Sequence, residues 1–129
     1  YLASKGIDLI LVARNKKEME RIKNSVKVDA KILSLDLTKE ENVYKLYEET
    51  KKDKIDILIN NAGFGLFGTF AETDLDRELE MIDLNIKAYH ILTKLFLKDF
   101  IKRDSGYILN VCSSAGFMAG PRLSTYYAT

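Results

Sequence analysis

The chain has 129 residues, the length of one domain or of part of one. Apolar residues make up 47% and charged residues 30%, a balance typical of a soluble globular protein, and the formal net charge is only +1. This charge excludes the strong positive field expected of a protein that binds nucleic acid or an anionic membrane, and no apolar run reaches the roughly 18–20 residues needed to cross a bilayer. The single cysteine, Cys112, excludes an internal disulfide framework and indicates a reducing, cytoplasmic setting.

Short apolar runs alternate with amphipathic stretches along the chain. The first six residues have the pattern of a last helical turn closed by glycine. Strands are predicted at 8–13, 30–35, 55–59 and 107–111, and helices at 16–26, 39–52 and about 75–100, the last as one helix or as two in line. This alternation predicts an α/β fold in which helices cover both faces of a doubly wound parallel sheet. We expect residues 1–129 to be a single partial domain from the interior of a longer chain, incomplete at both ends.

In an open parallel sheet, ligands bind beyond the carboxyl ends of the strands. Arg14 follows the first predicted strand, and the nearest acid after it is Glu18. In a dinucleotide-binding fold an acid at this strand end holds the ribose 2′-hydroxyl, whereas an arginine accommodates a 2′-phosphate. Arg14 therefore predicts a preference for NADP(H), with NAD(H) still possible. The alternative interpretation is a solvated arginine at a strand end.

Two polar segments lie at the ends of later strands. Asn60-Asn61-Ala62-Gly63 follows the strand at 55–59, and Gly63 allows a ligand to approach the main chain. Val111-Cys112-Ser113-Ser114-Ala115-Gly116 follows the last strand, and Tyr126 comes thirteen residues after Ser113. Taken singly, these residues also fit an ordinary turn, a loop serine and a core aromatic side chain.

Together and in this order, the segments resemble the core of a classical short-chain dehydrogenase/reductase, over essentially all 129 residues. The resemblance implies a Rossmann-type, dinucleotide-binding domain. It also implies that Asp36 and Leu37 contact the adenine ring, and that Asn61, Ala62 and Gly63 line the cofactor ribose. For Asp36 a helix N-cap is an alternative or additional role.

The resemblance further implies three catalytic residues. Tyr126 would act as acid or base, Ser113 would hold the carbonyl oxygen, and Asn85 would help hold a water in a proton relay. A phenol titrates near pKa 10 and needs a nearby cation to act near neutral pH. The family supplies a lysine four residues after the tyrosine, which here would come directly after Thr129. This register selects Tyr126 over Tyr127, and the thirteen-residue step selects Ser113 over Ser114.

The predicted function is therefore an NADP(H)-dependent oxidoreductase that transfers hydride between nicotinamide and a carbonyl or alcohol substrate. The family's glycine-rich phosphate loop and its lysine lie outside residues 1–129, so we expect this segment alone to be inactive. The alternative is a non-catalytic dinucleotide-sensing or scaffold protein on the same fold. The helix at 75–100 resembles the family's subunit-contact helix, which predicts a homodimer or homotetramer.

Several residues are expected to play structural parts. Because His90 is the only histidine, no metal site is predicted, and His90 is assigned to a helix surface or a partly packed position. Cys112 is expected to pack rather than react. Thr73 with Asp76 resembles a weak capping box. The three phenylalanines at 64, 67 and 70 are assigned to loop packing, with a substrate pocket as the alternative.

Overall fold

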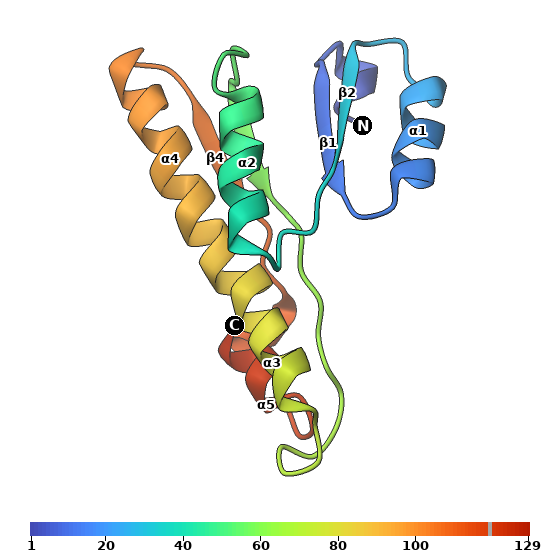
Figure 1. Cartoon of the computed structure of the whole chain (residues 1–129), viewed down its shortest axis with the longest axis vertical. Coiled ribbons are helices and arrows are strands. Elements are labelled where there is room, and N and C mark those ends of the chain that lie inside the picture. Colours follow the sequence, from blue (N-terminus) through green and yellow to red (C-terminus); the bar gives the residue numbers. More distant parts are fainter. Residues whose placement is uncertain (119) are drawn as a thin grey trace. The chain divides into compact units, whose positions relative to one another are not determined.

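The computed structural model describes residues 1–118 and 120–129, which form two compact units (Figure 1). The first unit spans residues 1–36 and the second residues 37–129. Each unit contains one pair of parallel strands with helices packed beside it. The parallel pairing is as predicted, but the four described strands form two two-stranded sheets instead of one continuous sheet.

The first unit is a strand–helix–strand unit. It begins with a 3₁₀ turn, η1 (Ala3–Lys5), closed by Gly6 at φ 76°, which confirms the predicted glycine-terminated turn. Strand β1 (Leu9–Ala13) pairs with β2 (Ala30–Ser34) in register from Leu9↔Ala30 to Ala13↔Ser34. Helix α1 (Lys16–Ser25) connects the strands and buries Met19.

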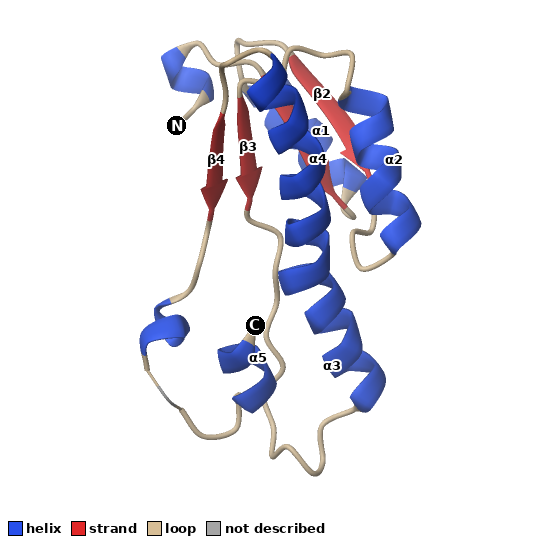
Figure 2. Ribbon diagram, turned by 90° about the vertical axis from the view of Figure 1, so that its left-hand side faces the viewer, coloured by secondary structure: helices blue, strands red, loops and turns tan. Residues whose placement is uncertain are grey.

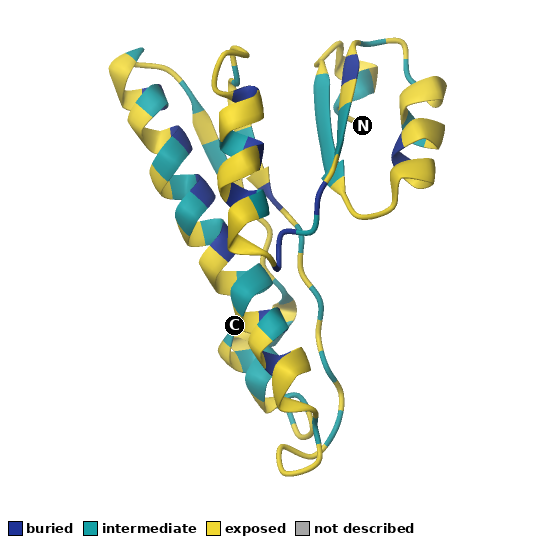
Figure 3. Ribbon diagram, in the orientation of Figure 1, coloured by how far each residue is buried: buried dark blue, intermediate teal, exposed yellow. Residues whose placement is uncertain are grey.

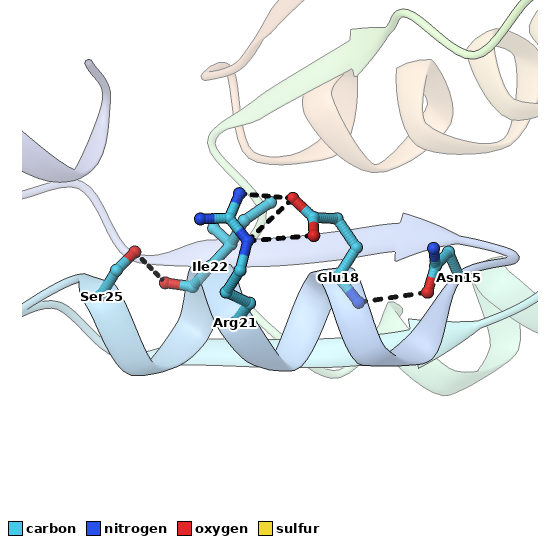
Figure 4. A network of polar contacts seen from close by, with 5 residues as sticks. All are labelled: Asn15, Glu18, Arg21, Ile22 and Ser25. Atoms are coloured by element: carbon cyan, nitrogen blue, oxygen red, sulfur yellow. Dashed lines mark hydrogen bonds and ion pairs between the residues drawn. The ribbon is translucent and has the colours of Figure 1, made fainter.

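The start and surface of α1 are stabilised by local polar contacts (Figure 4). The Asn15 side chain accepts a hydrogen bond from the backbone N–H of Glu18, which satisfies one of the free donors at the helix start. One turn on, the Arg21 guanidinium donates to both carboxylate oxygens of Glu18 at 3.1 and 3.0 Å. Because this ion pair is exposed to solvent, it contributes little to the stability of the fold.

The second unit packs helices against strands β3 (Ile57–Asn60) and β4 (Tyr107–Asn110), which pair in parallel from Ile57↔Tyr107 to Asn60↔Asn110 (Figure 2). Strand β3 begins two residues later than predicted and includes Asn60. Helix α2 (Glu40–Thr50) packs on the long helical segment that follows. The N-cap of α2 is Lys39, so the predicted capping role of Asp36 is wrong.

The long helical segment is continuous but has three parts: α3 (Leu75–Ile82), a π-helical turn η2 (Asp83–Ala88) and α4 (Tyr89–Lys102). Its N-cap is Asp74, whose side chain accepts from the N–H of Arg77; the predicted capping box of Thr73 and Asp76 is therefore wrong. Thr73 donates instead to the carboxylate of Glu78 at 2.6 Å.

The long helical segment has two apolar faces. One is buried and comprises Met81, Ala88, Leu92, Phe96 and Phe100. Its part on α4, dark in Figure 3, belongs to the helix that packs against α2 and the strands. The other is exposed and comprises Leu75, Leu79, Ile82, Ile86, Leu97 and Ile101. The helix predicted at about 75–100, as one helix or two in line, is thus one continuous segment whose helical period changes at the π-turn.

Beyond β4 the chain forms a short 3₁₀ turn, η3 (Ser114–Phe117), and the five-residue helix α5 (Ser124–Ala128). These two elements pack on one another. Helix α5 lies beyond the carboxyl ends of β3 and β4, beside the loop that leaves β3 (Figure 2). The second unit therefore gathers its loops at the sheet edge where ligands of parallel sheets bind.

Candidate active site

Asn60, the last residue of β3, ties the two strands and the long helix together. It is 3% exposed, and its Nδ2 donates to Asn110 Oδ1 at 2.8 Å and to Thr93 Oγ1 at 3.1 Å. Asn60 and Asn110 are register partners at the ends of their strands. A buried amide requires such partners, so this network fixes the sheet edge from which the polar loops leave.

The loop after β3 is held by Asn85. The Oδ1 of Asn85 accepts from the Phe64 N–H at 3.2 Å, and its Nδ2 donates to the Phe64 carbonyl at 3.0 Å. Asn85 lies in the π-turn η2, a feature frequent at functional sites. A side chain at Gly63 would stand 3.1 Å from the Asn85 Oδ1, so glycine leaves the space that the amide needs. Asn85 thus pairs with loop backbone, as an inward-facing polar residue must.

Tyr126 lies in α5 with its ring against the same loop. A Cβ built at Gly65 would be 3.2 Å from both Cγ and Cδ2 of the Tyr126 ring. The end of α5 is linked to Asn85, because Asn85 Nδ2 also donates to Thr129 Oγ1 at 2.9 Å. The structure therefore brings together Asn85, Tyr126 and the Gly63–Gly65 loop, three elements far apart in the sequence.

Ser113 precedes the turn η3. Its Oγ accepts a hydrogen bond from the Ala115 N–H at 3.1 Å, which makes it the N-cap of that turn. Because η3 packs on α5, Ser113 and Tyr126 belong to neighbouring elements. The hydroxyl of Ser113 still has a proton to donate while it accepts this bond.

The predicted cofactor-binding residues lie at strand ends in both units. In the first unit, Arg14 is exposed directly after β1, its carbonyl accepts from the Ser34 hydroxyl at 3.2 Å, and Asp36 is half-buried beyond β2. In the second unit, Leu37 is buried, Ala62 is half-buried, and Asn61 and Gly63 are exposed beyond β3. Arg14, Asn61 and Gly63 are thus open to a ligand, whereas Leu37 packs.

Cys112 is exposed, so the expectation that it packs is wrong. Its charge acts on Tyr89, the first residue of α4. Burial raises the pKa of the Tyr89 phenol, and the negative charge of a Cys112 thiolate raises it further. Tyr89 therefore stays protonated at neutral pH.

The three loop phenylalanines behave differently from one another. Phe67 and Phe70 are 68% and 70% exposed, so the expectation that they pack in the loop is wrong for both. Phe64 is half-buried beneath the Arg77 guanidinium, 4.9 Å from its ring centre. His90 is exposed, as expected of a helix-surface residue.

Sequence reasoning placed Asn60 in the segment 60–63 without giving it a role of its own, and it missed Gly65, Asn110 and Thr129 as parts of this region. A signal existed for the two asparagines, because both close neighbouring strands and therefore meet at one sheet edge. None existed for Gly65 and Thr129, whose partners lie 61 and 44 residues away.

Within residues 1–118 and 120–129, no group of three or more histidine, cysteine or acidic side chains could hold a metal ion. No described helix combines the length and apolar character needed to span a membrane.

Comparison with known proteins identifies relatives of this arrangement. A family model described as short chain dehydrogenase matches residues 1–129. A hydroxysteroid dehydrogenase-like protein of Gallus gallus is 31% identical over 99% of the chain, and an uncharacterized oxidoreductase of Staphylococcus saprophyticus is also 31% identical over 99%. The chain covers 41% and 57% of these two relatives, so it spans about half of their length.

Solved structures agree with the family model. A bulky-bulky ketone specific alcohol dehydrogenase from Comamonas testosteroni superimposes with a TM-score of 0.91 at 30% identity, covering 98% of this chain and 53% of that one. A short-chain dehydrogenase from Sphingobium yanoikuyae in complex with NADPH gives a TM-score of 0.90 at 31% identity, covering 98% and 52%. The predicted Rossmann-type α/β class is therefore confirmed.

Proposed function

The chain belongs to the short-chain dehydrogenase family, and from this premise we propose that the full-length protein is an NADP(H)-dependent oxidoreductase acting on a small carbonyl or alcohol substrate. Residues 1–129 would form part of its single dinucleotide-binding domain. The observation that carries the proposal is the meeting of Tyr126 with the Gly63–Gly65 loop and Asn85. A phenol held beside a polar, glycine-containing loop at the carboxyl end of β3 suits proton transfer next to a bound nucleotide.

In this proposal, side chains of this protein transfer the proton and orient the substrate oxygen. Tyr126 donates a proton to the developing alkoxide during reduction and accepts it during oxidation. The Ser113 hydroxyl donates a hydrogen bond to the same oxygen and orients it. Asn85 supports the proton path by holding the loop and the end of α5 in place. The nicotinamide, when bound, supplies or accepts the hydride.

Replacing the phenol tests the catalytic assignment. Tyr126→Phe in the full-length protein should abolish carbonyl reduction while leaving the Kd for NADPH unchanged, because only the proton donor is lost. Tyr127→Phe is the matched control, because it removes a neighbouring hydroxyl that packs near Gly120. Retained turnover in Tyr126→Phe would refute the assignment. Cofactor binding without turnover in the wild type would favour a sensing or scaffold role.

Arg14 supports the proposed cofactor preference. It is exposed at the end of β1, and its carbonyl, not its guanidinium, is engaged by Ser34. A guanidinium–phosphate bond contributes about 1.5–3 kcal/mol, so Arg14→Ala should weaken NADPH binding roughly ten- to a hundredfold and leave NADH binding unchanged. Lys17→Ala, which removes an exposed cation on α1, is the control for general charge effects. Equal losses for both cofactors would contradict the preference.

The exposed apolar face of the long helical segment supports a homo-oligomer. It carries six large apolar side chains, of which Leu75 and Ile101 are 66% and 69% exposed. A second copy of the chain would bury such a face at little cost in polar desolvation. Light scattering on the full-length protein should give a dimer or tetramer mass, and Ile86→Asp should lower it. A monomer in the wild type would refute this part of the proposal.

A further inference from the structure

We propose that Gly65 and Thr129 are positioning residues for Tyr126, one fixing its ring and the other fixing the helix that carries it. This inference rests on the proposed function, in which Tyr126 transfers the proton. Neither residue touches the reacting atoms in the proposed mechanism. Both act through contacts that set where the phenol points.

Gly65 provides the surface on which the Tyr126 ring rests. A Cβ there would stand 3.2 Å from Cγ, 3.2 Å from Cδ2 and 3.5 Å from Cδ1 of that ring. Two of these approaches are tighter than ordinary van der Waals contact, so the ring would shift by a few tenths of an ångström. The backbone of Gly65 does not require glycine, because its φ is not in the left-handed region, unlike that of Gly6 or Gly106. Glycine at this position is therefore explained by the ring.

Thr129 links α5 to Asn85. Its hydroxyl accepts from Asn85 Nδ2 at 2.9 Å and donates to the Tyr126 carbonyl at 3.1 Å. Asn85 is itself fixed by the two hydrogen bonds to the backbone of Phe64. An unbroken chain of hydrogen bonds therefore runs from the loop after β3, through Asn85 and Thr129, to the backbone of Tyr126.

These contacts matter because proton transfer depends on where the phenol points. The Gly65 contact acts on the Tyr126 ring, and the Thr129 hydroxyl acts on the Tyr126 backbone carbonyl. Together they constrain both the side chain and the backbone of Tyr126. A misplacement of about 1 Å at a reacting group can lower a rate about a hundredfold.

The full-length protein offers a matched set of threonine variants. Thr129→Val removes the bridging hydroxyl but keeps the shape of the side chain. Thr129→Ser keeps the hydroxyl and removes only the methyl group. Thr125→Val is the control on the same helix, because the buried Thr125 hydroxyl has no hydrogen-bond partner among the described residues. We expect Thr129→Val to lower kcat roughly ten- to a hundredfold while KM and the Kd for NADPH change less than about twofold. Thr129→Ser should recover most of the rate, and Thr125→Val should match the wild type.

Gly65→Ala supplies an independent test of the ring contact. It should lower kcat about tenfold or more with little change in the Kd for NADPH, because the three atoms nearest to the added methyl group all belong to the Tyr126 ring. This variant also keeps the proposal falsifiable if Thr129→Val fails to fold. Circular dichroism and thermal melting of each variant separate loss of fold from loss of rate.

Three outcomes would overturn the inference: an unchanged kcat in Thr129→Val or in Gly65→Ala, an equal loss in Thr125→Val, or no recovery in Thr129→Ser. The proposed function fails by a different result. If Tyr126→Phe retains turnover, the catalytic assignment itself is wrong. If Tyr126→Phe is inactive while Thr129→Val behaves as wild type, only the positioning role is wrong.

Discussion

Asn60→Ala is expected to destabilise the protein strongly although it removes only one small polar side chain. Asn60 is 3% exposed and donates two hydrogen bonds, to Asn110 at 2.8 Å and to Thr93 at 3.1 Å. Each contributes about 1 kcal/mol net, and the buried space left by the amide adds to the loss. We therefore expect a decrease of about 2–3 kcal/mol in the free energy of unfolding, a large part of the roughly 5–15 kcal/mol available to a domain.

Urea denaturation of the full-length protein, at one fixed protomer concentration, measures this loss. With an m-value of about 1–3 kcal/mol/M, the unfolding midpoint should fall by about 1 M at unchanged m. Asn24→Ala is the matched control, because Asn24 is exposed on α1 and should change stability by less than about 0.5 kcal/mol. An Asn60→Ala variant as stable as Asn24→Ala would refute the reasoning.

A double-mutant cycle with Asn110 tests the specific contact. Because Asn110 is exposed to solvent, Asn110→Ala alone should lower the free energy of unfolding less than Asn60→Ala does. The double variant should cost about 0.5–1 kcal/mol less than the sum of the single variants, because the shared hydrogen bond can be lost only once. Simple additivity would mean that the 2.8 Å contact contributes nothing to stability.

Two further outcomes follow from the second unit. The pKa of the Tyr47 phenol is raised, first by its 2.8 Å hydrogen bond to Asp99 and then by burial. The folded state therefore holds the phenol proton more tightly than the unfolded state. The stability that this proton contributes is present below about pH 10 and is lost as the pH rises further. Tyr47→Phe should remove that part of the alkaline destabilisation in urea titrations, and identical pH dependence in both proteins would contradict the assignment. Gly106→Ala should lower the free energy of unfolding by about 2 kcal/mol or more, because φ is 151° and a Cβ would meet the buried Phe100 ring at 2.3 Å. Gly116→Ala is the control: a Cβ there has nothing within 4 Å, so urea denaturation should show a nearly unchanged stability.

The sequence by itself determined the order of the four strands and the longer helices and the positions of the polar strand ends, but not η3 or α5. The four strands, the helix α1 and the glycine-closed first turn lie within a few residues of their predicted positions, because hydrophobic periodicity and turn residues act over short distances. The strand ends also indicated Asn61, Gly63 and Ser113, since parallel strands bring their carboxyl ends to the same edge.

The tertiary structure decided which side chains meet and which face of a helix is buried. The long helical segment has two apolar faces that both run past the π-turn, and periodicity alone cannot state which of them packs. The partners of Asn60, Asn85 and Tyr126 lie 21 to 61 residues away along the chain, too far for any local pattern to specify. Such contacts depend on how the elements dock. The space beside Gly65 and the hydroxyl of Thr129 acquire a role only once helix α5 lies beside the loop that follows β3.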